Sequence, residues 1–226
     1  MATRTRRTER REEPLSRERI VEAAIGLLDT AGERGLTFRA LAEHLATGPG
    51  AIYWHVTGKE ELLGAATEAV VGTMTAGTAG ATPQEEIRTL ALGVFDAIET
   101  HPWIGTQLAR APGKSPMLRV FEHLGRQVQA LGVPHTAQFT AVSALLNYVL
   151  GVAGQNAANA RAHQAHQPDT GRAEFLDTAA TAWADLDPAE YAFTRGVADQ
   201  LRDHDDREEF LAGIDLILTG ITARYQ

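Results

Sequence analysis

Residues 37–62 combine the residue types and the spacing that a pair of DNA-contacting helices requires. Thr37 is placed to cap a first helix, whose apolar residues follow at helical spacing. Residues 46–48 form a tight turn, and Pro49 suits the first position of a second helix because it has no N–H to leave unpaired. A turn of this kind lays the second helix into the DNA major groove. The segment therefore predicts a helix-turn-helix that contacts DNA.

The second of these helices is expected to end near Val56. Its Ile52 faces inward, and the side chains that project elsewhere are Tyr53, Trp54 and His55. For Trp54 the alternative is burial in the core, which indole rings favour.

Apolar residues recur at helical spacing along the rest of the chain as well. The first helix, which begins after Ser16, is closed by Gly32 and Gly35. Thr57 and Glu60 predict a capping box that starts a fourth helix. That helix runs out in residues 72–82, and further helices are expected at 84–100, 103–110, 117–131, 135–160, 173–184, 188–203 and 206–224. No segment shows sustained period-two alternation, so the predicted fold class is all-α.

The chain is acidic overall, but its charge is divided unevenly. The net charge of the 226 residues is −8. Residues 1–59 hold ten basic and eight acidic side chains, a balance of +2, which leaves −10 for the remainder. Phosphate contact is therefore expected at the N-terminal end. Residues 1–14 alternate Arg with Glu and Thr without apolar periodicity and predict a basic disordered arm, either a solvated tail or a groove contact.

Several classes of protein are excluded by composition. The absence of cysteine excludes disulfides, thiolate zinc sites and cysteine nucleophiles. No apolar segment follows the N-terminal arginines, so we expect the cytoplasm. Residues 127–160 carry no Asp, Glu, Lys or Arg, but polar residues and Pro134 interrupt them, so we expect no membrane span. A subunit interface explains the missing charge better, since interface cores are poor in charge.

Three segments and a homodimer follow from these patterns. The arm covers residues 1–14, the helix-turn-helix domain covers 15–62, and a larger helical domain that contains the expected dimer interface covers 63–226. The final helix carries apolar residues on more than one face. A helix of this kind needs burial against a partner. A two-fold dimer through this helix and residues 135–160 would present recognition helices to half-sites about 34–36 Å apart, or a multiple of that.

Residues 16–63 resemble the DNA-binding domain of the tetracycline-repressor (TetR) family. The residues that carry the resemblance are Ile52-Tyr53-Trp54-His55-Val56, followed by Lys59, Leu62 and Leu63. A weaker similarity continues to the C-terminus, where residues 210–221 resemble the last helix of the tetracycline-repressor branch. The resemblance implies three N-terminal helices that bind DNA, a fourth helix that acts as a lever, and further helices that form a ligand pocket and a dimer interface. Residues 63–226 are therefore expected to be a ligand-binding and dimerisation domain.

The resemblance implies DNA contacts for nine residues. They are Thr37, Arg39, Pro49, Gly50, Ala51, Tyr53, Trp54, His55 and Lys59. Arg39 reaches a phosphate or a guanine edge, and the resemblance favours the base; the alternative is a solvated arginine. Residues 49–51 are small and contact a thymine methyl group rather than make a bidentate pair. Lys59 also lies beside a helix N-terminus, and both attract a phosphate.

The expected ligand pocket departs from that of the tetracycline repressors, which bind a metal–drug chelate. An alignment without gaps places Leu90, Leu108, Leu124 and Gln155 where the polar ligands of those proteins stand. Three aliphatic residues and a neutral amide cannot coordinate a hard divalent cation. We therefore expect no metal, no cofactor and a largely apolar effector. The expected lining residues are Leu90, Val94, Trp103, Leu108, Leu124, Asn147 and Gln155.

Asn147 and Gln155 are interpreted as polar anchors in this apolar cavity, or alternatively as satisfied amides within the dimer interface. The sequence thus predicts a homodimeric, ligand-released transcriptional repressor that is not an enzyme and binds double-stranded operator DNA. The alternative is a helical enzyme or small-molecule carrier whose helix-turn-helix is incidental. Specific binding to duplex DNA distinguishes the two.

Overall fold

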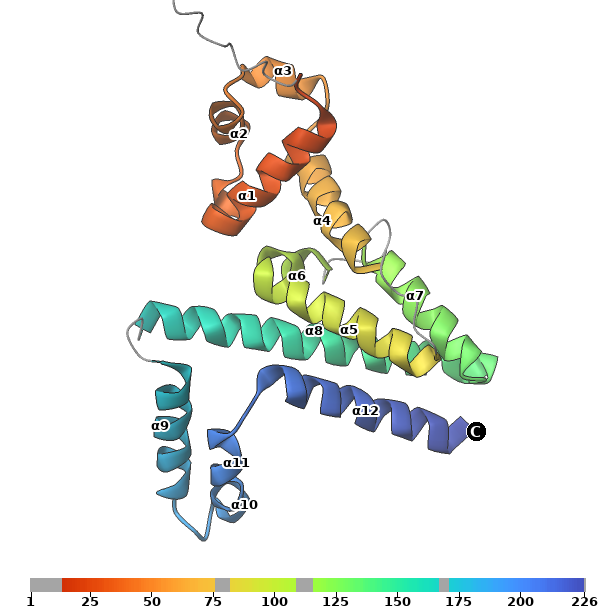
Figure 1. Ribbon diagram of the computed structural model, residues 1–226, viewed down its shortest axis with the longest axis vertical. Helices are drawn as coiled ribbons and strands as arrows, with labels where there is room; N and C mark the ends of the chain where they lie inside the picture. Colours follow the sequence, from red (N-terminus) through yellow and green to blue (C-terminus); the bar gives the residue numbers. More distant parts are fainter. Residues whose placement is uncertain (1–13, 76–81, 109–115, 167–170, 226) are drawn as a thin grey trace, which may run out of the picture. The chain divides into compact units, whose positions relative to one another are not determined.

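The computed structural model describes residues 14–75, 82–108, 116–166 and 171–225, and every regular element within these ranges is a helix (Figure 1). The side chains of residues 75 and 162–166 lie outside this description, as do residues 1–13 of the expected arm. The prediction of an all-α fold is confirmed. The chain divides into two compact units, Met1–Ala69 and Val70–Gln226. The division falls inside a helix, later than the expected boundary at residue 63.

The first unit is built from three helices and the start of a fourth. They are α1 (Arg17–Gly35), α2 (Phe38–His44), α3 (Pro49–Tyr53) and α4 (Lys59–Thr75). Caps begin two of them: the Ser16 hydroxyl accepts the Arg19 N–H, and the Thr37 hydroxyl accepts the Ala40 N–H. The core contains the fully buried Ile20, Ala24, Leu28, Leu41 and Ile52.

Helix α1 bends before it ends. Gly32 has a φ of 62°, a left-handed conformation that glycine adopts without steric strain, and Leu36 is buried just beyond the helix. The expected closure at Gly32 and Gly35 therefore corresponds to a bend followed by the helix end.

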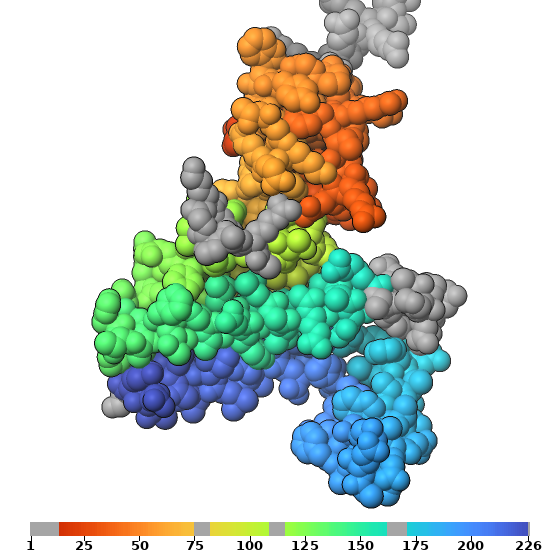
Figure 2. All heavy atoms as spheres, turned by 180° about the vertical axis from the view of Figure 1, so that it is seen from behind, coloured from red at the N-terminus to blue at the C-terminus, as the bar shows by residue number. Residues whose placement is uncertain are grey.

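The second unit contains the remaining helices. They are α5 (Pro83–Thr100), α6 (Trp103–Leu108), α7 (Met117–Ala130), α8 (His135–His166), α9 (Arg172–Ala184), α10 (Ala192–Gly196), α11 (Ala198–Arg202) and α12 (Asp206–Tyr225). A capping box between Thr82 and Glu85 starts α5. Helix α8 packs against α5, α6, α7 and α12, while α9 packs against α10 and α11. Both views show α8 and α12 side by side (Figures 1 and 2).

Helix α8 is the centre of the second unit. Val142, Leu145, Val149 and Ala153 are buried along it. By length and composition His135–Arg161 could cross a membrane. The polar residues in this segment therefore do not exclude a membrane span by themselves, contrary to the expectation from the sequence. Its buried side chains and its packing against four helices are those of a core helix.

The helix predicted over residues 188–203 is wrong as a single element. Two short helices, α10 and α11, replace it, because Val197 between them departs from helical geometry with a φ of −106° and a ψ of 5°. The start is displaced as well, since the Asp187 carboxylate accepts the N–H groups of Ala189 and Glu190 and holds a turn there. Local capping therefore overrides the apolar spacing in this segment.

Candidate functional site

The turn between α2 and α3 sets the angle at which the second helix is presented. Ala46 has a φ of 51°, in the left-handed region, and the Thr47 N–H donates to the Ala42 carbonyl at 2.9 Å. This bond closes the C-terminal end of α2. Pro49 is the first residue of α3, as the sequence predicts. Helix α3 ends at Tyr53, earlier than the expected end near Val56, because Trp54 caps it.

Most of the residues expected to contact DNA lie on the surface. Thr37, Arg39, Pro49, Gly50, Tyr53 and Trp54 are exposed, whereas Ala51, His55 and Lys59 are half-buried. Arg39 makes no hydrogen bond or ion pair within the described ranges, so its guanidinium is available to an incoming phosphate or base. Trp54 is 90% exposed, which rules out the alternative of core packing within this chain.

Tyr53 is held by a residue that the sequence did not single out. Its ring stacks on Phe38 with the ring centroids 4.4 Å apart and the planes 2° from parallel. Phe38 begins α2 and Tyr53 ends α3, so the stack joins the two helices at the exposed surface. An aromatic pair of this kind contributes about 0.5–1.5 kcal/mol. The aromatic types at both positions were the only signal in the sequence.

Polar contacts fix the start of α4 within the first unit. The Thr57 N–H and hydroxyl both donate to the Glu61 carboxylate at 2.7 Å, and Arg17 donates to the same carboxylate at 3.2 Å. The Thr57 backbone, the Thr57 hydroxyl and Arg17 together lower the pKa of Glu61 to about 2. The predicted capping box is therefore wrong in its acid, since Glu61 rather than Glu60 returns to Thr57.

Lys59 has a structural contact in addition to its expected role. Its Nζ donates to the backbone carbonyl of Glu33, next to the bend in α1. An ammonium group carries three donors, so this bond leaves two for a phosphate.

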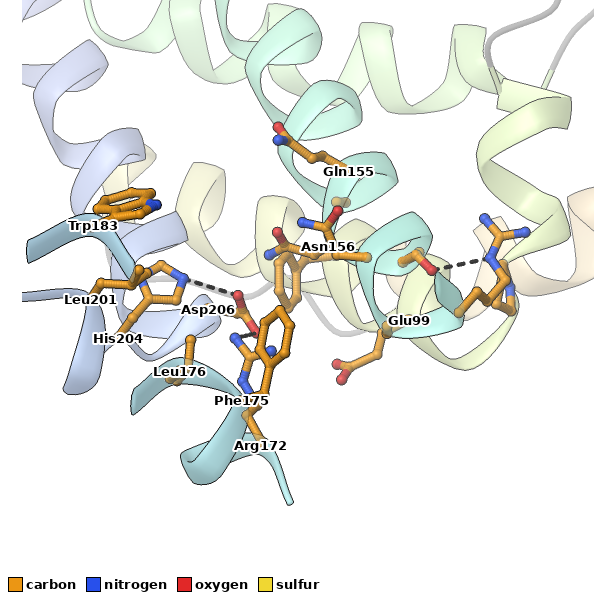
Figure 3. Close-up of a pocket in the computed structure, with 17 residues that line it drawn as sticks. Glu99, Gln155, Asn156, Arg172, Phe175, Leu176, Trp183, Leu201, His204 and Asp206 are labelled. Atoms are coloured by element: carbon orange, nitrogen blue, oxygen red, sulfur yellow. Dashed lines mark hydrogen bonds and ion pairs between the residues drawn. The ribbon is translucent and has the colours of Figure 1, made fainter. Parts of the chain in front are cut away.

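The second unit contains a cavity of about 890 Å³ near the C-terminal end of α8 (Figure 3). Its wall is formed by α5, α8, α9, the end of α11 and the start of α12. The apolar lining residues are Phe95, Pro102, Ala153, Ala157, Ala160, Phe175, Leu176, Trp183 and Leu201. The polar ones are Glu99, Gln155, Asn156, Asn159, Arg161, Arg172, His204 and Asp206. Ligand cavities of about 300–1,000 Å³ with mostly apolar walls are typical of small-molecule sites.

Three charged or titratable side chains meet at one edge of this cavity. Arg172, at the start of α9, forms an ion pair with Asp206, at the start of α12. The His204 Nε2 lies 3.0 Å from the same carboxylate. Figure 3 shows these contacts on the side opposite Glu99. The carboxylate of Asp206 is therefore already engaged by two neighbours.

The structure does not gather the expected ligand-binding residues around this cavity. Leu90, Val94, Trp103, Leu108 and Leu124 are buried in the core of the second unit, and none of them lines it. Asn147 is exposed on α8 and does not line it either. Gln155 alone among the seven faces the cavity. The alignment with the tetracycline repressors compared positions along α5 to α8 only. It therefore could not reveal the lining residues that come from α9 and the start of α12.

Comparisons with known protein families give a match for each of the two units. Residues 20–66 match the family described as bacterial regulatory proteins, tetR family, and residues 77–225 match the tetracyclin repressor-like C-terminal domain. A solved structure of the transcriptional regulator SCO7222, a TetR from Streptomyces coelicolor, is 63% identical, with a TM-score of 0.84 over 94% of this chain and 100% of that one.

Two sequence relatives match over shorter lengths. An HTH-type transcriptional regulator from Saccharopolyspora erythraea is 30% identical over 139 residues, 61% of this chain and 59% of the relative. The tetracycline repressor protein class C from Escherichia coli is 44% identical over 57 residues, 25% of this chain and 26% of the relative. In both cases the match spans less than two thirds of the relative's length.

Proposed function

Because this chain belongs to the tetR family of bacterial regulatory proteins, we propose that it is a ligand-responsive transcriptional repressor. It binds double-stranded operator DNA as a homodimer and is released by a small, largely apolar effector. The observation that carries this proposal is the α2–turn–α3 surface, where Arg39, Tyr53 and Trp54 are all exposed. Exposed aromatic and cationic side chains on a helix-turn-helix match the groove and backbone of DNA.

The DNA contacts are assigned by chemistry and position. Arg39 reads a base edge, while the N-terminal residues of α3, Pro49, Gly50 and Ala51, approach the bases closely and make no bidentate contact. The phosphate and groove contacts come from Thr37, Tyr53, Trp54, His55 and Lys59. Operator DNA places the protein in the cytoplasm.

The homodimer is proposed to form through α8 and α12. Leu216 on α12 is 76% exposed in the single chain, and a large aliphatic side chain in water favours burial against a partner. Helix α8 carries no Asp, Glu, Lys or Arg from 135 to 160, which suits an interface core. Leu216→Glu should convert the dimer to a monomer in sedimentation, whereas Leu118→Glu, an exposed leucine on α7, should leave the dimer intact.

The effector is proposed to occupy the cavity beside α8 and α9, without a metal. Within the described residues no group of three or more His, Cys, Asp or Glu side chains is placed to hold a metal ion. Helix α4 continues from one unit into the other and is the proposed lever that alters the spacing of the two recognition helices. A coupling of about 1–3 kcal/mol would lower operator affinity roughly 5–150-fold, and DNA would weaken effector binding by the same factor.

Hydroxyl-radical footprinting on the DNA upstream of the chain's own gene tests the proposal. The expected result is two symmetric protected half-sites, about 34–36 Å apart or a multiple of that. Protection without symmetry, or none above that of random DNA, would refute the assignment of a dimeric repressor.

A further inference from the structure

The cavity beside α8 has two unlike walls, one of carboxamides and one of aromatic rings. We propose that it binds a flat, uncharged aromatic compound that carries hydroxyl or carbonyl groups along one edge. This inference rests on the proposed function and names the chemical class of its effector.

The carboxamide wall is supplied by one stretch of α8. Gln155, Asn156 and Asn159 line the cavity and lie within about one third of the helix circumference, given roughly 100° per residue. None of their side chains makes a hydrogen bond within the described residues. A carboxamide offers both a donor and an acceptor, which is what mixed hydroxyl and carbonyl groups require. This wall therefore selects neutral polar groups arranged along an edge.

The aromatic wall comes mainly from α9. Phe175 and Trp183 are exposed to the cavity from this helix, and Phe95 of α5 is buried at its edge. Figure 3 shows Phe175 below the amides of Gln155 and Asn156, with Trp183 farther along the cavity. Aromatic rings in the wall of a cavity favour a flat aromatic ligand, which can stack against them.

The charges around the cavity favour an uncharged ligand. Two arginines, Arg161 and Arg172, are matched by two carboxylates, Glu99 and Asp206. Arg172 is already paired with Asp206, and Arg161 donates its Nε–H to the Ala157 carbonyl. A ligand anion would meet the carboxylates, and a ligand cation would meet the arginines. Because the two arginines and the two carboxylates sum to zero formal charge, the cavity offers no net charge to either kind of ion.

Calorimetric titration of the full chain with three probes tests this inference. The probes share one flat ring system: 2,7-dihydroxy-9-fluorenone, fluorene without polar groups, and 9-fluorenone-2-carboxylate as the anion. We expect the dihydroxy compound to bind at least about 10-fold more tightly than the other two, since it alone satisfies the amides without adding charge. Tightest binding of fluorene or of the carboxylate would overturn the inference.

Single-residue variants then locate the binding. Asn156→Leu should weaken the dihydroxy probe about 3- to 10-fold and leave fluorene unchanged. Phe175→Leu should weaken both of these probes about 2- to 10-fold. Gln200→Leu, which replaces an exposed amide outside the cavity, should change neither. If Asn156→Leu does not fold, the exposed Asn159→Leu provides the same comparison. Equal losses in Asn159→Leu and Gln200→Leu would place the probe elsewhere.

Operator binding by the same samples, measured without a probe, distinguishes a wrong ligand class from a wrong function. A chain that binds operator DNA but none of the probes keeps the proposed function and refutes the ligand class. A chain that binds the dihydroxy probe at these residues but no DNA supports the ligand class and refutes the repressor.

Discussion

Gly213 of α12 should not tolerate even a methyl group, because Tyr148 of α8 covers it. A Cβ added at Gly213 would overlap the Tyr148 hydroxyl and come within 2.9 Å of its ring carbon Cε2. The ring is not free to move, since the hydroxyl donates to the Phe210 carbonyl at 3.2 Å and the ring stacks on Phe210 at 5.7 Å. Gly213→Ala therefore tests the packing of the two helices through which we propose dimerisation.

The magnitude follows from two opposing effects. Overpacking in a well-packed contact typically costs about 1–3 kcal/mol. Replacement of glycine by alanine inside a helix contributes about 1 kcal/mol in the other direction. We therefore expect a net loss of up to about 2 kcal/mol in the free energy of unfolding. Gly125→Ala is the matched control, because a Cβ there has no neighbour within 4 Å, and it should stabilise by about 0.5–1 kcal/mol.

Urea unfolding at one fixed protein concentration measures both variants. In a Tyr148→Ala background the obstruction is gone, so Gly213→Ala should become stabilising, as Gly125→Ala is. If Gly213→Ala stabilises the unmodified chain as much as Gly125→Ala does, then Tyr148 does not lie over α12, and the described packing of α8 on α12 is wrong.

Three further predictions concern the DNA-binding unit. Arg39→Ala should cost about 1–3 kcal/mol on the operator alone in fluorescence anisotropy, and equal losses on all duplexes would reassign Arg39 to the phosphates. Lys59→Ala should weaken specific and random duplexes equally and reduce the salt slope by about one; an unchanged slope would mean that Lys59 serves only the Glu33 carbonyl. Because the folded pKa of Glu61 is about 2, below its ordinary 4.5, its contribution to stability is present above pH 4.5 and is lost as the pH falls toward 2. Unfolding curves of the unmodified chain and Glu61→Gln should therefore converge over that window, with a small difference because the group is exposed to solvent.

Local sequence signals predicted the helix-turn-helix well. Features that depend on contacts between residues distant in the chain were predicted less well. The cap at Thr37 and the proline at 49 act within one helical turn, so the sequence contains the whole cause. The acid that returns to Thr57 could not be chosen between adjacent glutamates, because Arg17, distant in the chain, helps to hold Glu61.

The candidate ligand site was harder to predict, for a similar reason. Its wall joins α5 and α8 to α9 and the start of α12, and no periodicity in one helix reports which residues of another will face it. Gln155 was predicted because the alignment without gaps places it where a polar ligand of the tetracycline repressors stands. That alignment singled out neither Asn156 and Asn159 on the same helix nor Phe175 and Trp183 on α9.

The central claim is that this chain recognises one DNA sequence through α3. Its most direct test compares affinities for the footprinted operator and for a shuffled duplex of equal length and composition, over a series of salt concentrations. The predicted result is tighter binding to the operator by about 10³–10⁷-fold at physiological salt, with both affinities falling as salt rises. Equal affinities for the two duplexes would contradict the claim.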